Sequence, residues 1–579
     1  MGIKFTQMER AAMIRTLVDE PLDLLVIGGG VTGAGILLDA QTRGMRVALV
    51  EMQDFAAGTS SRSTKLVHGG LRYLKQFDIS VVVEVGRERA IVYENAPHVT
   101  TPLWMLLPIV EGGTYGKLMS ALGLIVYDRL ARVKPAERNR MLTKEEALRV
   151  EPLLNPTGLK GAGYYVEYRT DDARLTLEIL KEAVARGAVA LNYAKAEKLV
   201  YEQGLVRGAT VQDRLRGETI TVHAKKVVNA TGPWVDRLRE MDHSKVGKTL
   251  HWTKGVHIVV DGGRFPLRNP VYFDVPDGRM VFAIPRTGKT YVGTTDTNYQ
   301  GDPERPLASA KDRDYLMNCV NHMFPDVLLC AEDIEALWAG VRPLIHEEGK
   351  SPSEISRKDE VLTSPSELIT IAGGKLTGYR KMADKVVSHV AALLERDGHA
   401  AFPPCQTERM ELSGGKFNGS ANLAPLIDEQ TRAGVALGLT QDAAATLASR
   451  YGTNVGEVYA ILRDERDAVA ASGLAPDVYA ALHYGMRREM LATPADFFIR
   501  RTAAMFFDVA WVRMWKDPVL RHMAVTLDWS EEQTRAYRDE LEARLVEATH
   551  VSADELNHPL PNPTKRDNIY NTCQEVRGR

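Results

Sequence analysis

The sequence feature that most constrains the fold is a strand, a glycine turn, a helix and a second strand near the N-terminus. The apolar run Leu24–Ile27 leads directly into Gly28-Gly29-Gly30-Val31-Thr32-Gly33, and an Ala- and Leu-rich helix then leads to Arg46–Val50. Gly28, Gly30 and Gly33 let the backbone approach a pyrophosphate at the positive end of the helix. Glu51 follows Gly33 by 18 residues and can hold a ribose hydroxyl. The spacing favours a dinucleotide-binding βαβ unit over a structural glycine turn.

Two later strands are typical of the rest of such a sheet. Val222–Ala230 continues into Thr231-Gly232, and Leu368–Ala372 ends on Gly373-Gly374 before another helix. Both place glycine and backbone N–H groups at the carboxyl end of a strand, where open α/β sheets bind ligands. Gly232 and Gly374 are therefore candidate cofactor-binding residues, although ordinary strand-to-helix turns give the same pattern.

The chain has 579 residues, more than one hydrophobic core usually supports, so it should contain several domains. Alternating strand patterns at 164–168, 256–260, 280–284 and 290–293 indicate an antiparallel sheet inserted into the nucleotide-binding domain. After Pro403-Pro404 the strand signals end and helical stretches dominate. We predict a mixed α/β fold with a Rossmann-type domain (20–95, 168–245 and 331–400), an antiparallel substrate domain (96–167 and 246–330), a C-terminal helical domain (404–555) and a tail (556–579).

Charge and cysteine content exclude several classes of protein. Lys plus Arg total 73 against 75 for Asp plus Glu, a net charge of −2, so no global basic field favours nucleic acid. The 4 cysteines show no C-x-x-C spacing, which indicates neither a zinc site nor a disulfide scaffold and favours a reducing compartment. No apolar run reaches the roughly 18–20 residues that cross a bilayer, and the first residues lack the apolar region of a secretory signal. We expect a cytoplasmic protein without a metal.

The most informative segment is the loop that follows Glu51, from Gly58 to Leu74. It carries several small hydroxyl residues and then Gly69-Gly70 among basic residues, which suits a loop that wraps a pyrophosphate. Together with the glycine turn, this loop resembles the flavin-dependent glycerol-3-phosphate dehydrogenases, members of the amino-acid-oxidase-like FAD superfamily. The resemblance covers about residues 20–400 and continues more loosely beyond. Further family motifs are Lys254–Val260, Gly293–Thr297, Gly340–Leu344, Ile355–Arg357 and Gly373–Arg380.

The resemblance implies a role in glycerol metabolism, the oxidation of sn-glycerol 3-phosphate to dihydroxyacetone phosphate. Hydride would pass from C2 of the substrate to N5 of FAD. The resemblance assigns FAD to the glycine turn, to Glu51 and to residues of the later motifs. These residues are Thr59, Ser60, Ser61, Lys65, Leu66, His68, Gly232, Gly374 and Thr377.

A secondary alcohol needs a base for its hydroxyl proton, and His257 is the candidate. Imidazole titrates near neutral pH without a large shift, and His257 lies in one of the family motifs. A histidine within a strand is more often packed or surface-exposed, so only the motif favours the catalytic interpretation. His68 and His346 are rivals, although His68 is expected to lie beside the flavin.

A phosphorylated substrate also needs cations. Arg342, Arg357 and Lys375 match family positions and join His257 in the predicted catalytic set, while Arg72 and Tyr73 are assigned to substrate binding. Arginine presents a planar fork to phosphate or to a developing alkoxide. Surface ion pairs are the ordinary alternative for each arginine, core packing is the alternative for Tyr73, and the sequence does not divide the two anion-binding roles among the cations.

The resemblance favours membrane quinone as the electron acceptor, with the protein peripheral on the inner face of the cell membrane. Leu103–Val110 and Lys117–Lys134 offer apolar faces near basic side chains, which suits an interfacial element, but cap-domain elements packed on their own core give the same pattern. The alternatives are a glycerol-3-phosphate oxidase that uses oxygen, an amine or amino-acid oxidase on the same fold, and a nucleotide-binding protein without redox chemistry. The sequence is compatible with a homodimer and does not fix the oligomeric state.

Overall fold

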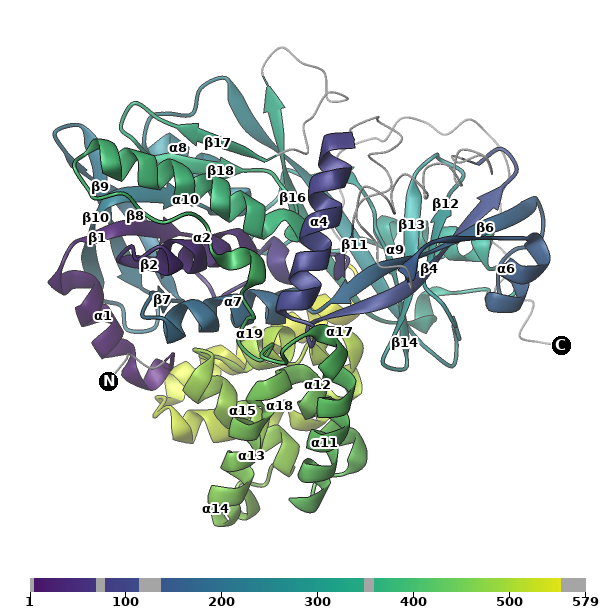
Figure 1. Cartoon of the computed structure of the whole chain (residues 1–579). Coiled ribbons are helices and arrows are strands. Elements are labelled where there is room, and N and C mark those ends of the chain that lie inside the picture. Colours follow the sequence, from purple (N-terminus) through teal and green to yellow (C-terminus); the bar gives the residue numbers. More distant parts are fainter. Residues whose placement is uncertain (1–4, 69–78, 114–136, 348–358, 553–579) are drawn as a thin grey trace.

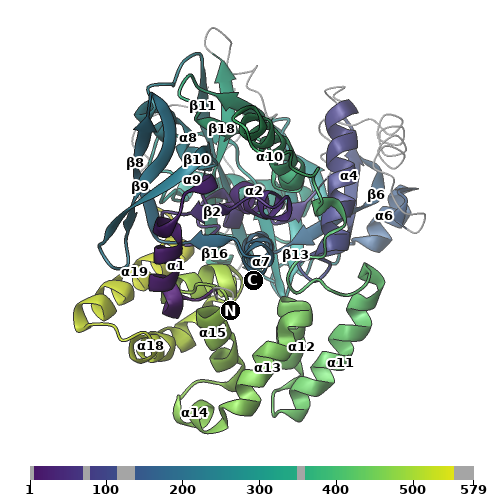
Figure 2. The ribbon, with the colours of Figure 1, turned by 60° about the vertical axis from the view of Figure 1, so that its left-hand side comes forward.

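The computed structural model describes residues 5–68, 79–113, 137–347 and 359–552. Figure 1 shows a helix-covered parallel sheet beside an antiparallel sheet, with the C-terminal helices beneath them. Figure 2 shows the same helices under both sheets from a second direction. The predicted mixed α/β fold, with its antiparallel sheet and C-terminal helical domain, is confirmed.

The parallel sheet is built on the N-terminal βαβ unit. Its strands run in the order β17 (Glu360–Thr363), β18 (Ile369–Ala372), β10 (Thr219–Asn229), β1 (Leu22–Ile27), β2 (Val47–Val50) and β7 (Val189–Leu191), with β8 (Ala194–Glu202) and β9 (Leu205–Asp213) extending it beside β10. All pairs from β18 to β7 are parallel. The strand order reverses at β1, and the carboxyl ends of β1 and β10 therefore flank the crevice in which such sheets bind ligands.

Three helices stack along one face of this sheet (Figure 1): α2 (Val31–Thr42), α7 (Asp172–Ala185) and α10 (Tyr379–Arg396). Gly35 lets α2 and α10 approach closely, because a Cβ there would lie 2.9 Å from the ring of Tyr379. Among the described residues, the other α-helices before the C-terminal domain are α1 (Arg10–Asp19), α4 (Ile79–Asn95), α6 (Lys144–Val150), α8 (Val235–Met241) and α9 (Ala310–Met323).

The second sheet is mainly antiparallel. Its strands run in the order β15 (Thr297–Asn298), β11 (Lys248–Asp261), β14 (Lys289–Gly293), β13 (Met280–Arg286), β12 (Val271–Asp274), β4 (Thr100–Val110), β6 (Leu159–Thr170) and β3 (Leu66–Val67), while β16 (Ile334–Glu347) pairs with β11 and β5 (Arg140–Leu142) with β6. Because β3 and β16 belong to this sheet, the predicted assignment of residues 20–95 and 331–400 wholly to the nucleotide-binding domain needs correction. A strand pattern alone does not show which sheet a strand joins.

The regular elements of the C-terminal domain between 404 and 551 are helical: α11 (Leu423–Ala436), α12 (Gln441–Tyr451), α13 (Val455–Asp464), α14 (Arg466–Ala471), α15 (Pro476–Arg488), α16 (Pro494–Asp496), a π-helical turn (Phe497–Arg501), α17 (Ala504–Phe507), α18 (Val509–Thr526) and α19 (Glu531–Thr549). The domain packs α17 and α19 on β16 of the second sheet and its π-helical turn on α7 beside the parallel sheet. Over the described parts of the chain, we find no helix with the length and hydropathy to cross a membrane.

The structure places most of the apolar side chains of Leu103–Val110 inside the protein. This segment lies in β4, between β12 and β6, and Met105, Leu106 and Leu107 are buried in the protein's own core. The apolar run thus stabilises the second sheet, as the cap-domain alternative requires. Lys117–Lys134 lies wholly outside the described residues.

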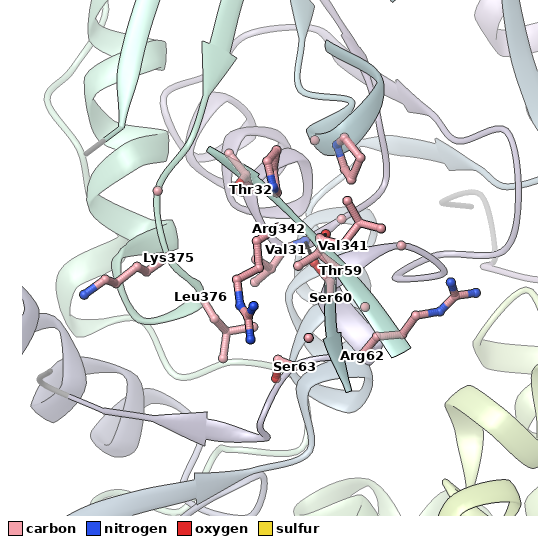
Figure 3. A pocket seen from close by; sticks show the side chains of 18 of the residues that line it. Val31, Thr32, Thr59, Ser60, Arg62, Ser63, Val341, Arg342, Lys375 and Leu376 are labelled. Atoms are coloured by element: carbon pink, nitrogen blue, oxygen red, sulfur yellow. Dashed lines mark hydrogen bonds between the residues drawn. The ribbon is translucent and has the colours of Figure 1, made fainter. Parts of the chain in front are cut away.

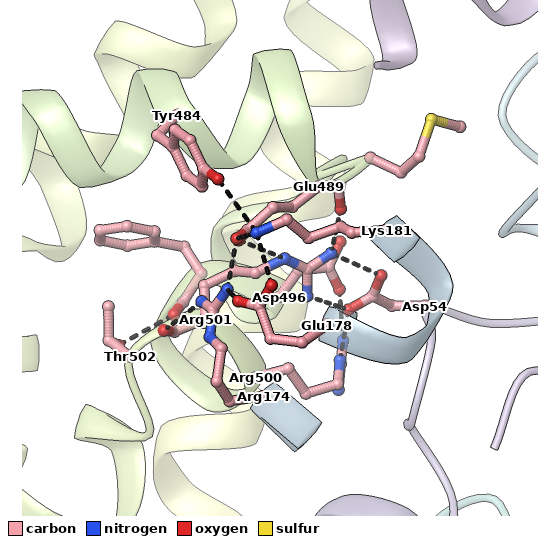
Figure 4. A network of polar contacts seen from close by, with 12 residues as sticks. Asp54, Arg174, Glu178, Lys181, Tyr484, Glu489, Asp496, Arg500, Arg501 and Thr502 are labelled. Carbon is pink, nitrogen blue, oxygen red and sulfur yellow. Dashed lines mark hydrogen bonds and ion pairs between the residues drawn. The ribbon is translucent and has the colours of Figure 1, made fainter. Parts of the chain in front are cut away.

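A buried network of ion pairs joins the parallel sheet to the C-terminal domain (Figure 4). Asp54, on the loop after β2, accepts hydrogen bonds from Arg500 at 2.6 Å and from Arg501 at 2.8 and 3.0 Å. Glu489 pairs with Arg174 and with Lys181 of α7. Burial alone would raise the pKa of Asp54, but Arg501 and Arg500 lower that pKa to about 2. The carboxylate is therefore charged wherever the protein is folded near neutral pH.

Candidate active site

A cavity of about 880 Å³ lies where the carboxyl ends of the parallel strands meet the second sheet. Its lining comes from the glycine turn after β1, the loop after β2, the ends of β10 and β18, and strands β11, β13 and β16. Figure 3 shows how these segments converge. A cavity of this size lies in the range of small-molecule and cofactor sites.

The glycine turn has the geometry of a phosphate cradle. Gly28 has a φ of +117°, and a Cβ there would lie 2.5 Å from the carbonyl oxygen of Ala230. Gly33 packs α2 against β1, because its Cβ would lie 1.9 Å from the oxygen of Gly28. Gly30 is the N-cap of α2 and offers no capping side chain, and the N–H of Val31 donates to Ser60 Oγ at 2.9 Å. The positive end of α2 thus faces the cavity with little to block an anion.

Glu51, at the end of β2, lines the cavity and shapes the turn. Its carboxylate accepts the N–H of Gly29 at 2.6 Å and that of Gln53 at 2.8 Å. Burial raises the pKa of Glu51, while these two N–H groups oppose the rise. Each carboxylate oxygen retains a lone pair for a ribose hydroxyl, so the residue fits a dinucleotide.

The loop after β2 contains residues that line the cavity and residues that do not. Thr59, Ser60, Leu66 and His68 line it, as do the more distant Gly232, Gly374 and Thr377. Ser61 is buried beside the cavity rather than on its wall. The Lys65 ammonium is 2.7 Å from Asp172 and 3.0 Å from the carbonyl of Ser61, so it fastens the loop to α7 and does not line the cavity.

His257 projects from β11 into the cavity wall and is only 1% exposed. Its Nε2 lies 3.0 Å from Thr64 Oγ1, and its Nδ1 has no hydrogen-bond partner within the described residues. Burial, and then the positive charges of Arg342 and Lys65, hold the pKa of His257 well below its ordinary value. The expectation of a nearly unshifted imidazole is therefore wrong, because a strand pattern does not show how deeply the ring is buried. The ring is neutral at neutral pH.

Arg342, on β16, also faces the cavity. It donates to Thr294 Oγ1 at 2.8 Å and lies 3.2 Å from Asp296 Oδ1, yet 31% of its side chain is accessible. Lys375 lines the same cavity, but its side chain extends away from Arg342 (Figure 3). Of the predicted catalytic residues, the structure thus brings Arg342 and His257 together, and Lys375 lies farther along the cavity wall.

Not every predicted site residue can be placed. Arg72, Tyr73 and Arg357 lie outside the described residues. His346, a rival for the base, lies near the far end of β16 and does not line the cavity. His68 does line it, but burial and then the charges of Lys375 and Arg89 lower the pKa of His68 to about 3.

Sequence reasoning gave no role to several residues that the structure places at the site, and three of them matter most here. Thr64 contacts His257, Trp338 stacks on it, and Arg237 of α8 lines the cavity. Arg237 could have been noticed, because it stands on the helix that follows the glycine turn after β10. Thr64 and Trp338 carry no signal of their own, since their importance depends on packing between distant segments.

Comparisons with known proteins agree with this geometry. Residues 23–374 match the model of the family described as FAD dependent oxidoreductase, and residues 405–534 match the C-terminal domain of alpha-glycerophosphate oxidase. The aerobic glycerol-3-phosphate dehydrogenase of Bacillus subtilis (strain 168) is 56% identical over 548 residues, covering 95% of this chain and 99% of the relative. That of Staphylococcus aureus (strain USA300) is 53% identical over 544 residues, covering 94% and 97%.

A solved structure is similar over the same extent. The X-ray structure of the glycerol-3-phosphate dehydrogenase from Bacillus halodurans, complexed with FAD, has a TM-score of 0.82 and 50% identity, covering 94% of this chain and 98% of that one. The crevice at the switch point suits a dinucleotide, and together with the family match it places the chain among the dinucleotide-dependent oxidoreductases. The chain belongs to the FAD-dependent oxidoreductase family, and FAD is its cofactor.

We expect Gly30→Val to abolish FAD binding while the protein still folds. The added side chain would occupy the face of the cradle that an anion must approach, and its nearest neighbour would be the Ser60 hydroxyl, 3.1 Å from the Cβ. The measurement is the ratio of flavin to protein absorbance after purification. Gly456→Val is the matched control, because that site in α13 has open space around it. A full flavin complement in the Gly30 variant would contradict the assignment of the cradle.

Proposed function

We propose that the protein oxidises sn-glycerol 3-phosphate to dihydroxyacetone phosphate and passes the electrons to membrane quinone. The names of the relatives, which match nearly the whole chain, support the substrate. The observation that carries the proposal is that the dinucleotide cradle, His257 and Arg342 all open onto one cavity. When bound, FAD supplies the acceptor, at N5, for the hydride that leaves C2 of the alcohol.

His257 is the proposed base for the C2 hydroxyl proton. A base must be unprotonated, and the lowered pKa of this buried imidazole keeps it so at neutral pH. As the hydride leaves carbon, the O–H electron pair forms the carbonyl bond and the proton goes to the imidazole. Burial then favours rapid loss of that proton, because a charged ring is poorly solvated there.

Arg342 is the proposed contact for the phosphate or for the developing alkoxide. Thr294 and Asp296 bind the two terminal nitrogens of its guanidinium and so orient the group, whose accessible side can still approach an anion. Lys375 supplies further positive charge to the same cavity. We propose that Arg72, Tyr73 and Arg357 complete this set, as the family resemblance implies.

One assay tests the substrate and the acceptor separately. Glycerol 3-phosphate, added without oxygen, should bleach the flavin absorption, and a soluble quinone analogue should restore it. Absence of bleaching would contradict the substrate. The name attached to the match at residues 405–534 favours oxygen as a second candidate acceptor. Reoxidation by air as fast as by the quinone analogue would favour that oxidase.

The proposed use of quinone requires contact with the membrane surface. We propose peripheral association, which flotation of the purified protein with phospholipid vesicles would test. Failure to float, combined with fast reoxidation by air, would contradict both the association and the quinone acceptor. A homodimer is part of the same proposal, and light scattering would give the mass of the particle in solution.

Replacing Arg342 by Leu should weaken the use of glycerol 3-phosphate at least about tenfold, because a charge-assisted contact of roughly 1.5–3 kcal/mol is lost. Arg342→Lys keeps the charge but not the fork and should be intermediate. Flavin reduction at a range of substrate concentrations measures the effect. Arg264→Leu is the control, since Arg264 is also partly accessible and paired with a carboxylate, Asp333, but lies off the cavity.

Plain glycerol separates the two roles of Arg342. A phosphate contact helps only the phosphorylated alcohol, so only that substrate should suffer in the leucine variant. An equal loss with both alcohols would assign Arg342 to the reacting oxygen. If the leucine variant oxidises both alcohols at the parent rate, Arg342 does not contact the substrate.

A further inference from the structure

His257 rests on an aromatic residue of the neighbouring strand. His257 of β11 and Trp338 of β16 are register partners, and their rings lie nearly parallel, with 4.7 Å between centroids and 10° between planes. The indole N–H of Trp338 donates to the carbonyl of Ser63 at 3.2 Å. The indole plane is therefore fixed by a hydrogen bond as well as by packing.

Gly293, on the other side of His257 in the sheet, leaves room for the imidazole. A Cβ at Gly293 would lie 2.0 Å from Cδ2 of His257, so only glycine permits the ring to occupy this position. The imidazole thus fits between the backbone of β14 and the indole of Trp338. Its orientation depends on the indole remaining where it is.

The C-terminal domain holds the indole. Phe506 and Phe507 of α17 pack against Trp338, with centroid distances of 5.2 and 5.7 Å. Phe507 also packs edge-on against Tyr291 at 5.7 Å, and the Tyr291 hydroxyl donates to the carbonyl of Thr64 at 3.1 Å. Because the Thr64 hydroxyl contacts His257 Nε2, α17 reaches the imidazole both through the stacked rings and through Thr64.

We propose that Trp338, Phe506 and Phe507 are positioning residues that fix the plane of the His257 imidazole. The C-terminal domain would thereby contribute to proton transfer in a cavity that none of its described residues lines. Proton transfer requires a side chain held within roughly 10–20° of the productive geometry, which a packed ring stack provides. The inference rests on the proposed role of His257 as the base.

The first test compares Trp338→Leu, which removes the ring plane, with Trp338→Phe, which keeps one. In the holoenzyme, Trp338→Leu should slow flavin reduction about 10- to 100-fold with FAD retained, and Trp338→Phe should recover most of the rate. Leucine should also admit water beside His257, so its pKa should rise and the acidic limb of the pH–rate profile should move to higher pH. If Trp338→Leu leaves both the rate of flavin reduction and the acidic limb of the pH–rate profile unchanged, the inference is overturned.

A double-mutant cycle separates this inference from the proposed function. If Trp338 acts through His257, then Trp338→Leu should change the rate less than about twofold in a His257→Ala background. The same fold-loss in both backgrounds would overturn the positioning role while leaving the base in place. If His257→Ala alone leaves the rate of flavin reduction unchanged, then His257 is not the base, and the inference fails together with the proposed function.

A second pair of variants tests the contribution of the C-terminal domain. Phe507→Leu should slow flavin reduction and move the acidic limb of the pH–rate profile to higher pH, although Phe507 does not line the cavity. Phe273→Leu is the matched control, because Phe273 is also a buried phenylalanine, but it lies in β12 of the second sheet and packs on Phe324. Equal effects of the two substitutions would reduce the role of Phe507 to stability. The Phe507 result decides the inference if Trp338→Leu fails to retain FAD.

Discussion

His257→Ala should slow the reduction of bound flavin by glycerol 3-phosphate about 10²- to 10⁴-fold, because general-base catalysis typically contributes that much. FAD should remain bound, since the ring contributes to the second sheet rather than to the glycine turn. Rapid mixing without oxygen measures the step directly. His251→Ala is the matched control: His251 lies on the same strand, but it contacts Asn298 and does not line the cavity. Equal rates for the two variants would mean that the base lies elsewhere.

The pH dependence of the same step follows from the environment of His257. Burial and the nearby charges of Arg342 and Lys65 lower its pKa, so the imidazole stays neutral below pH 6.5, where a free imidazole protonates. The rate of flavin reduction should therefore hold as the pH falls through 6.5 and decline only at more acidic values. A decline centred at or above pH 6.5 would contradict the buried, neutral base.

Asp54→Ala should destabilise the protein by about 3–5 kcal/mol, because it leaves Arg500 and Arg501 buried without their shared carboxylate. The loss in the free energy of unfolding is measured by urea unfolding monitored through tryptophan fluorescence. Asp464→Ala, which breaks an exposed pair with Arg463, is the control and should change stability by less than about 1 kcal/mol. A similarly small loss in the Asp54 variant would show that the other carboxylates of the network compensate.

Acid should weaken the same network in a definite direction. The pKa of Asp54 is lowered in the folded protein, so its contribution to stability is complete above the unfolded value of about 3.9 and is lost as the pH falls toward 2. The Asp54→Ala variant should therefore lose less stability than the parent protein over that interval. Equal losses would place the acid sensitivity elsewhere.

The glycine turn was predictable from the sequence because its chemistry is local. Gly28 and Gly33 are required by a positive φ and by a contact within one βαβ unit, and both constraints depend on residues close in the chain or on the adjoining strand. Family motifs added Arg342 and Lys375, which the structure places on the cavity wall. Their individual roles remain predictions, because they depend on a substrate's position.

Other features depended on distant partners and could not be predicted. Lys65 lies in a loop that suits a cofactor, yet its ammonium pairs with Asp172, 107 residues away. Thr64 and His257 are separated by 193 residues. The shifted pKa of His257 likewise follows from burial between β14 and β16 and beside Thr64, and a hydropathy pattern does not contain that information.

The order in which strands enter the parallel sheet affects when the protein can capture its cofactor. β1 and β2 leave the ribosome early, but β10 follows β3 to β6 of the second sheet, and β18 follows every strand of that sheet in the described part of the chain. The nascent chain therefore lacks part of the cavity wall for most of translation, and the apolar edges of its unpaired strands are exposed to chaperones. The cavity wall includes Gly373 to Thr377, so it is complete only once β18 and the turn after it are in place, and a cofactor that binds the folded protein then stabilises it as a folding ligand does.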